Sequence, residues 1–168
     1  MYALAVALEL LAACGSQLPT QLPPLAGRRS IAMSVDTTGV ASPIGMPADS
    51  VWALLPAIYQ ELGLPVHERD EKSRRQAACW IRLRGRLGKT PLSRLIDCGE
   101  LRSVPNADRM QVELLVLTSV RQESHGGTTI STFVLGTAGE SAGSANRVWC
   151  LSTGGLETRI REALERSG

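Results

Sequence analysis

The stretch at residues 110–121, "MQVELLVLTSVR", decides the fold of this chain. Its even-numbered positions from Met110 to Val120 are apolar apart from Thr118. Its odd-numbered positions, beginning with Gln111, are polar or charged apart from Leu115 and Leu117. Such strict alternation is typical of a strand whose two faces meet different surroundings. After a turn at 122–127, residues 128–138, "TTISTFVLGTA", supply a second β-rich run. We therefore expect a long antiparallel hairpin at the centre of a sheet.

Shorter strands are predicted around this hairpin, in segments bounded by turn residues. Residues 36–45 are rich in Gly, Ser and Pro and are expected to form a loop. Residues 85–106 are expected to be irregular, with one helical turn at 92–96. The predicted strands are 30–35, 64–69, 75–84 and 147–152.

Two amphipathic segments predict helices that cover the sheet. The first begins near Pro47, which suits a first helical turn, and ends at Gly63. Pro56 inside it is expected to kink it or leave one carbonyl unpaired. The second closes the chain, with Ser152 or Thr153 near its cap. Their apolar stripes are Val51, Leu55, Ile58 and Leu62 in the first, and Leu156, Ile160, Ala163 and Leu164 in the second.

This order of elements predicts an α+β fold: an antiparallel sheet of about five or six strands with two helices packed on one face. We expect residues 30–168 to form this single domain. Aromatic residues make up only 4% of the chain, so the core must consist of Leu, Val, Ile and Ala. The net charge of +2 is small and dispersed, which argues against nucleic-acid binding.

The N-terminus begins with an apolar run at residues 3–13, interrupted by Glu9. It is too short for a bilayer-spanning helix, which needs about 20 residues, but it has the size of a secretory h-region. It ends in Leu11-Ala12-Ala13-Cys14-Gly15, which resembles the lipobox of bacterial lipoproteins. The resemblance implies a signal peptide at 1–13 and a lipid on the sulfur of Cys14. It also implies a protein anchored on the periplasmic side of a bacterial membrane.

Three further interpretations of this segment stay open. Met1-Tyr2 carries no positive charge, unlike the usual n-region, which is explained if the true start lies upstream. The second alternative to a signal peptide is an uncleaved membrane anchor. The third is an N-terminal core helix with a buried Cys14. Residues 14–29, with three prolines, are expected to be a semi-extended tether, which fits the core helix poorly.

Three cysteines remain if Cys14 is lipidated. Cys79 alternates with apolar neighbours and is expected to be a buried, unpaired hydrophobic residue. Cys98 and Cys150 lie at the edges of ordered segments, and we expect a disulfide between them, which an exported domain would retain. The alternative is three unpaired thiols. No cysteine spacing is typical of a metal site, so we expect neither a metal nor a cofactor.

The predicted domain resembles the helix-grip and related domains of bacterial envelope lipoproteins. One such family comprises the accessory lipoproteins of the outer-membrane β-barrel assembly machinery. The resemblance lies in the order of elements over residues 30–166. It implies a non-catalytic accessory subunit of a membrane-associated assembly, either in outer-membrane biogenesis or on the periplasmic side of an energy-transducing complex.

Motifs that suggest catalysis are incomplete. Residues 139–143, "GESAG", match the G-x-S-x-G elbow of α/β-hydrolases, but no histidine follows Ser141 as that arrangement requires. Residues 85–90, "GRLGKT", lack the first glycine of a phosphate-binding loop. His67 and His125 are expected to be solvated. We therefore expect no catalytic residue, and a hydrolase that uses Ser141 is the second alternative function.

The three tryptophans lie off the predicted apolar stripes. Trp52, Trp80 and Trp149 are therefore candidate contacts for a protein partner, or alternatively cover the second face of the sheet. A further alternative function is a small-ligand binder that uses a groove between helix 47–62 and the sheet.

Overall fold

The computed structural model describes Cys14, residues 39–141 and residues 146–168. The predicted signal peptide, most of the predicted tether and the predicted strand at 30–35 lie outside these residues. For the rest of the chain, the α+β fold is confirmed.

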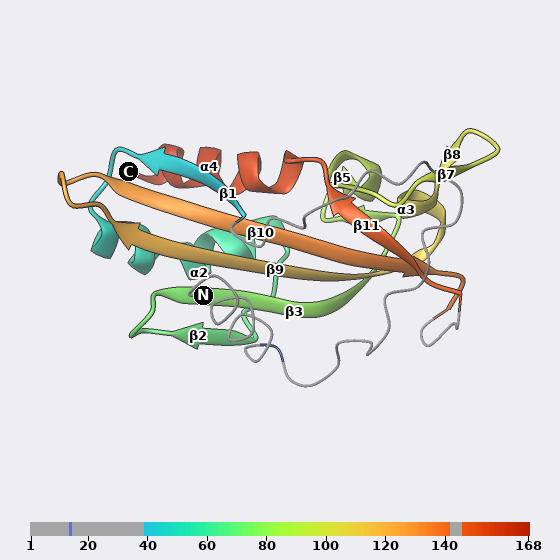
Figure 1. Ribbon diagram of the computed structural model, residues 1–168, viewed down its shortest axis with the longest axis horizontal. Helices are drawn as coiled ribbons and strands as arrows, with labels where there is room; N and C mark the ends of the chain where they lie inside the picture. Colours follow the sequence, from blue (N-terminus) through green and yellow to red (C-terminus); the bar gives the residue numbers. More distant parts are fainter. Residues whose placement is uncertain (1–13, 15–38, 142–145) are drawn as a thin grey trace, which may run out of the picture.

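The predicted hairpin forms the centre of the sheet (Figure 1). Strands β9 (Gln111–Gln122) and β10 (Thr128–Gly139) pair antiparallel from Gln122 opposite Thr128 to Gln111 opposite Gly139. Strand β3 (Arg75–Arg84) pairs with the free side of β9, and β2 (Glu68–Asp70) pairs with β3. Of the strand predicted at 64–69, only the last two residues belong to a strand, β2.

Two short strands share the other side of β10. Strand β1 (Val40–Ile44) pairs with its first half, and β11 (Val148–Ser152) pairs with its second half. The prediction of a loop at 36–45 was wrong for β1. Its Pro43, which lacks an N–H group, is tolerated because β1 is an edge strand among the described residues.

The region 85–106 is less irregular than predicted. A 3-10 turn, η1 (Leu92–Arg94), falls where one helical turn was expected. Around it are two-residue strands and a short helix: β4 (Arg86–Leu87), β5 (Thr90–Pro91), β6 (Ile96–Asp97), β7 (Glu100–Leu101), β8 (Val104–Pro105) and α3 (Asn106–Arg109). Strand β6 pairs with β11, whereas β7 and β8 form a separate hairpin that projects from one end of the sheet (Figure 1).

Both predicted long helices are present. Helix α2 (Ala48–Leu62) begins after Pro47 and ends at Gly63, whose left-handed φ of 78° explains the glycine. Helix α4 (Gly155–Ser167) begins after Gly154. The two helices contact each other, α2 contacts β9 and α4 contacts β10, so both lie on one face of the sheet.

The core fills the space between these helices and the sheet. It contains the predicted helix stripes together with the even-numbered apolar residues of β9 and β10. A buried polar chain crosses it, because the Tyr59 hydroxyl donates to Thr118 Oγ1 at 3.0 Å, and Thr118 Oγ1 lies 3.1 Å from Thr132 Oγ1. Burial raises the pKa of the Tyr59 hydroxyl well above its usual value, although its bond with Thr118 opposes this.

Candidate functional site: the sheet face without helices

The face of the sheet opposite α2 and α4 is also apolar. Because successive side chains of a strand point to opposite faces, the odd-numbered residues of β9 and β10 lie away from the helices. Their neighbours across the sheet follow from the register of β3 and β11. We call this surface the open face. It consists of Ala77, Leu115, Leu117, Phe133, Leu135, Trp149 and Leu151.

Burial varies from the centre of the open face to its margin. Leu115 and Leu117 at the centre are 5% and 7% exposed. Phe133, Leu135 and Trp149 are half-buried, and Leu151 at the margin is 39% exposed. An antiparallel sheet commonly has one solvated, polar face, whereas here both faces are apolar. The centre of this face is therefore buried, and its accessible part is the margin formed by Phe133, Leu135, Trp149 and Leu151, which we consider as a candidate interface.

Arginines lie at both ends of the open face. Arg75 is opposite Ser119, and Arg121 is opposite Thr129. At the other end, Arg82 is opposite Glu113 and Arg84 is opposite Gln111. Arg84 and Arg121 are both exposed.

Glu113 is the carboxylate of β9 on this face, and it is already engaged. Its oxygens lie 3.6 Å from Arg82 Nε and 3.3 Å from Arg147 Nη2. Arg147 also donates to the hydroxyl and the carbonyl of Thr137. Glu113 therefore neutralises part of the positive charge of Arg82 and Arg147 at its end of the face. The exposed Arg84 at the same end contributes a further positive charge.

A β-bulge interrupts β3 beside the open face. Ala78 is opposite Val116 and Ile81 is opposite Leu114, so two residues of β3 stand where the register allows one. These residues are Cys79 and Trp80, and Trp80 adopts a φ of 47°, which is rare for a bulky side chain. The prediction that Cys79 shares a face with Ile81 was wrong, because the bulge shifts the alternation.

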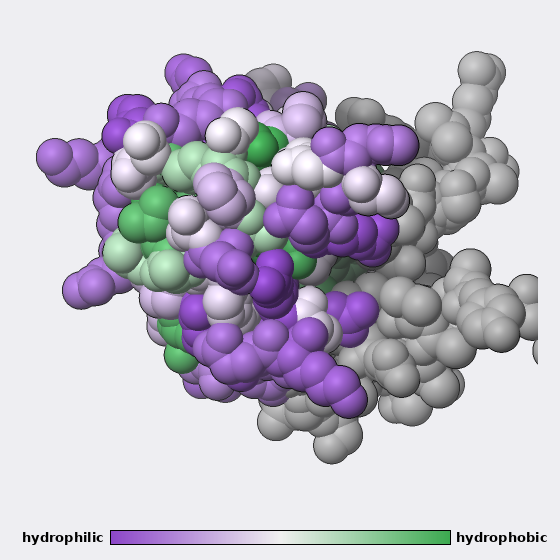
Figure 2. Space-filling model, turned by 90° about the vertical axis from the view of Figure 1, so that its left-hand side faces the viewer, coloured by the Kyte–Doolittle hydropathy of each residue, from purple (hydrophilic) through white to green (hydrophobic). Residues whose placement is uncertain are grey.

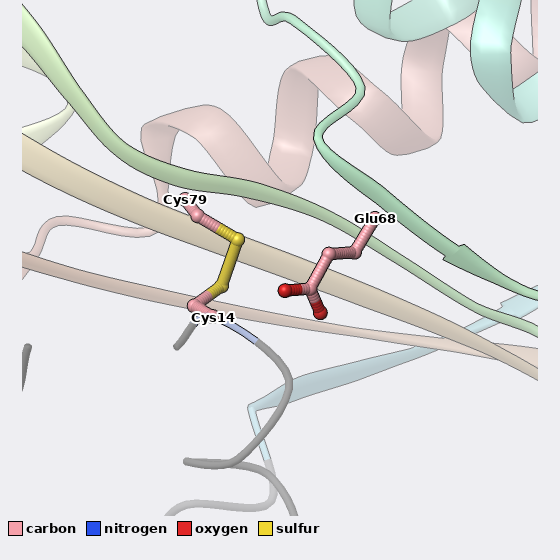
Figure 3. Close-up of side chains that lie close together, drawn as sticks. All are labelled: Cys14, Glu68 and Cys79. Atoms are coloured by element: carbon pink, nitrogen blue, oxygen red, sulfur yellow. A yellow bond between two sulfur atoms is a disulfide. The ribbon is translucent and has the colours of Figure 1, made fainter. Parts of the chain in front are cut away.

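Cys79 forms a disulfide with Cys14, with the two Cα atoms 5.4 Å apart (Figure 3). The prediction of an unpaired Cys79 was therefore wrong. Glu68 lies beside the pair, opposite Ala77 of the open face. Burial raises the pKa of the Glu68 carboxyl above its usual value, and the charge of His67 opposes this.

These three side chains are of types that bind metal ions, but the two cysteines are not available as ligands. The sulfurs of Cys14 and Cys79 and a carboxylate oxygen of Glu68 lie within 4.8 Å of one another (Figure 3). Cysteine binds metals as a thiolate, and here the two sulfurs are bonded to each other. The arrangement thus fastens Cys14 to the edge of the open face.

The second disulfide joins Cys98 and Cys150, the pair that the sequence favoured. Both residues belong to the core between sheet and helices. The bond connects the segment between β6 and β7 to β11, the strand that carries Trp149. It therefore fixes one margin of the open face from the opposite side of the sheet.

The tryptophans have different environments. Trp52 is only 7% exposed, so the prediction that it is a candidate partner contact was wrong. Its indole N–H donates to Glu71, and the guanidinium of Arg69 lies 3.7 Å from the ring centroid. The bond from Trp52, followed by that from Arg69, lowers the pKa of the Glu71 carboxyl. Trp52 is part of a folded side-chain cluster.

Trp149 and Trp80 remain available at the open face and its bulge. Both are half-buried. The indole nitrogen of Trp149 is buried, and within the described part of the chain it has no hydrogen-bond partner. A buried donor without a partner is costly, so this indole nitrogen lowers the stability of the fold.

The structure separates the residues considered for catalysis. Ser141 follows the end of β10, whereas His125 lies in the turn before its start. The strand has 12 residues, and a rise of about 3.3 Å per residue places the two roughly 40 Å apart. His67 precedes β2, and its Nδ1 accepts the backbone N–H of Cys79. Neither histidine is close to Ser141.

The end of the domain that holds the β9–β10 turn is mostly hydrophilic. Figure 2 shows polar side chains there around a smaller apolar area. His125 is exposed in this turn, as predicted. The open face lies along the strands and is not the surface in this view.

No known family profile matches the chain, and no curated protein matches its sequence significantly. Among the described residues, no helix has both the length and the apolar character that crossing a bilayer requires.

Proposed function

We propose that the protein is a non-catalytic, exported interaction module. It docks through its open face onto a protein of a larger membrane-associated assembly. A lipid on Cys14 holds it on the periplasmic side of a bacterial membrane. The observation that carries the proposal is the accessible margin of the open face, where Phe133, Leu135 and Trp149 are half-buried, Leu151 is exposed and neither α2 nor α4 lies over the strands.

The composition of the open face supports docking of a protein. Trp149 and Phe133 are aromatic residues of the kind enriched at interface centres. Arginine, which is also enriched at energetically important positions, lies at both ends. The apolar centre and charged margin match the usual anatomy of an interface.

The disulfide between Cys98 and Cys150, which is compatible with a lipid on Cys14, supports export. Disulfides persist in the periplasm and outside cells and are rare in a reducing cytosol. The lipid anchor rests on the lipobox resemblance. A thioether on Cys14 and the bond between Cys14 and Cys79 use the same sulfur atom, so the anchored form has Cys79 as a free thiol.

A ligand groove beneath α2 is less well supported. The side chains of Val51, Leu55 and Ile58 fill the space toward the sheet, and each is almost completely buried. A small ligand there would have to displace them.

The state of Cys14 is tested by intact mass and thiol counting on membrane-purified protein. We expect a chain that begins at Cys14, carries the mass of acyl chains and has one reactive thiol at Cys79. Cys14→Ser should abolish the added mass and release the protein from membranes. A full-length chain without a reactive thiol would disprove the anchor and leave the docking proposal standing.

Docking is tested separately by photo-crosslinking in cells. A photoreactive residue at Phe133 should give a protein adduct of defined mass. The matched control is Glu162, which is exposed on α4, on the opposite side of the sheet from the open face. Adducts at neither position, or equal adducts at both, would disprove docking through the open face.

A further inference from the structure

We infer that the β7–β8 hairpin is a membrane-contact element, whose tip lies on the surface of a bilayer that contains anionic phospholipid. This inference rests on the location given by the proposed function, because it provides the anchored domain with a second contact to the same membrane. Three features of the hairpin lead to it: the exposure of its tip, the rigidity of its base and the charge of the segment around it.

Two large apolar side chains are exposed together on the hairpin. Leu101 is 52% exposed and Val104 is 47% exposed. The register pairs them directly across the two strands, which places their side chains on the same face. Every residue from 99 to 105 is exposed, so no other part of the described chain covers this pair. The pair is therefore an accessible apolar surface, unlike the centre of the open face.

The turn between the two strands holds an arginine beside these side chains. Arg102 and Ser103 have φ values of 53° and 63°, the positive values that a two-residue type I′ hairpin turn requires. Glycine adopts such angles at less cost, so the turn accepts backbone strain while it presents two larger side chains at the tip. At a bilayer surface, the stem of an arginine lies along hydrocarbon while its guanidinium reaches the lipid phosphates.

The base of the hairpin is fixed to the core. Cys98, just before β7, is bonded to Cys150 of β11. Just after β8, Asn106 donates its backbone N–H to the carbonyl of Gly99 at 2.9 Å and its side-chain N–H to the carbonyl of Cys98 at 3.1 Å. The tip is thus held in one orientation relative to the sheet. Contact of the tip with a surface therefore orients the whole domain.

Positive charge is concentrated in the segment that carries the hairpin. Residues 84–109 contain six basic residues against three acidic ones, which is a net charge of +3, whereas the whole chain has +2. All six basic residues are exposed, and none belongs to an ion pair among the described residues. Because α3 contacts β3, β8 and η1, the arginines of these elements lie at the end of the domain from which the hairpin projects (Figure 1). The six are Arg84, Arg86, Lys89, Arg94, Arg102 and Arg109.

The acidic residues of this segment lie away from the turn. Asp97 accepts the backbone N–H of Gly99 at 2.8 Å, and Asp108 accepts the backbone N–H and the hydroxyl of Ser93. These bonds hold both carboxylates at the base of the hairpin. The third acidic residue, Glu100, is at the start of β7. The turn at the tip therefore carries positive charge and no carboxylate.

This composition favours a lipid surface over a protein pocket. The centres of protein interfaces are enriched in aromatic residues, and the four residues 101–104, "LRSV", include none. Aliphatic side chains next to basic ones bind anionic bilayers, through burial of apolar area and attraction to the headgroups. Two aliphatic side chains bury little area, so the contact is weak on its own. It orients a domain that Cys14 already anchors and does not replace the anchor.

Vesicle sedimentation tests the contact in the absence of the anchor. The protein is the full chain with Cys14→Ser, and the vesicles contain either phosphatidylcholine alone or equal parts of phosphatidylcholine and phosphatidylglycerol. We expect binding to the anionic vesicles to be at least about fivefold tighter, because each arginine near an anionic surface contributes about that factor. The difference should shrink in high salt.

Variants of this protein locate the contact on the hairpin. Leu101→Ser with Val104→Ser should weaken binding to anionic vesicles about tenfold, and Arg102→Gln should weaken it about fivefold. The matched controls are Val40→Ser, whose side chain is 50% exposed, and Arg166→Gln on α4, and both should leave binding unchanged. All these side chains are exposed, so circular dichroism should show an unchanged fold. The N-terminal residues are the same in every variant and cannot account for a difference between variants.

Photo-crosslinking on membranes identifies what the tip touches. A photoreactive residue at Ser103 of the anchored protein should form adducts with phospholipid. The matched control is His125, which is exposed in the β9–β10 turn at the opposite end of the sheet (Figure 1). We expect far fewer lipid adducts there.

Several outcomes would overturn the inference. No binding to anionic vesicles, equal binding to both kinds of vesicle, or unchanged binding of the hairpin variants would disprove the contact. Equal lipid adducts at Ser103 and His125 would disprove an oriented domain. A protein adduct of defined mass at Ser103 would identify a protein pocket as its partner. None of these results alters the Phe133 crosslink or the mass of the anchored chain, so failure here is distinguishable from failure of the proposed function.

Discussion

The two faces of the central sheet are built from the same strands but carry different chemistry. Toward α2 and α4, the strands present Val, Leu and Ile that are almost completely buried. Toward the other side, they present Phe133 and Trp149, with arginines at both ends. Alternation along β9 thus separates a face covered by α2 and α4 from a face without helices, whose central Leu115 and Leu117 are nonetheless buried.

Each face also has its own disulfide. The bond between Cys98 and Cys150 lies in the core, whereas the bond between Cys14 and Cys79 lies beside Glu68 at the edge of the open face. The sequence separations are 52 and 65 residues. Because these separations are similar, loop closure alone predicts a similar stabilisation from the two disulfides. The two disulfides therefore differ mainly in how deeply they are buried.

The largest expected effect is at the core disulfide. In the double variant Cys98→Ala with Cys150→Ala, we expect unfolding to become easier by about 4 kcal/mol, because the closed loop is lost. Urea denaturation followed by circular dichroism measures this. The open-face variant Cys14→Ala with Cys79→Ala is the comparison. A larger loss there would mean that the open face, not the core, depends more on its covalent link.

A pair of truncations measures how much each face contributes to stability. Leu114 lies in the core and Leu135 on the open face. Leu114→Ala should cost about 3 kcal/mol, whereas Leu135→Ala should cost about 1 kcal/mol because its side chain is only half-buried. Urea midpoints at a constant slope give both values. Equal losses would reveal the open face as a second core.

The smallest expected effect concerns the buried polar chain. Tyr59→Phe should cost about 1 kcal/mol at neutral pH, because Thr118 loses a partner. Burial raises the pKa of Tyr59, so above about pH 10 the unfolded chain releases a proton that the folded chain retains. Stability should then fall by about 1.4 kcal/mol per pH unit, and Tyr59→Phe should remove this part of the slope. A slope that is identical in both proteins would contradict the assignment.

Much of the fold was predictable because its signals are local. The alternation in 110–121 predicted β9 within one or two residues, and the turn at 122–127 predicted its pairing with β10. Pro47 and Gly63 marked the ends of α2. These signals depend on side-chain periodicity and on preferred backbone angles, which neighbouring residues determine.

The candidate site was less predictable. Leu115 and Leu117 stand out in the sequence as apolar residues at odd positions, and this was the available signal for a second apolar face. Trp52 lies outside the apolar stripe of its helix, yet Arg69 and Glu71 from a distant segment enclose it. No local pattern identifies such partners.

Local signals in the sequence were enough to specify the long hairpin, the two helices and the α+β class, because periodicity and capping act over a few residues. Packing of the whole chain was needed to establish which face stays without helices and where the bulge at Cys79 and Trp80 falls. The same is true of the partner of Cys14. These features depend on contacts between segments far apart in the chain, whose relative positions are fixed only once the core is packed.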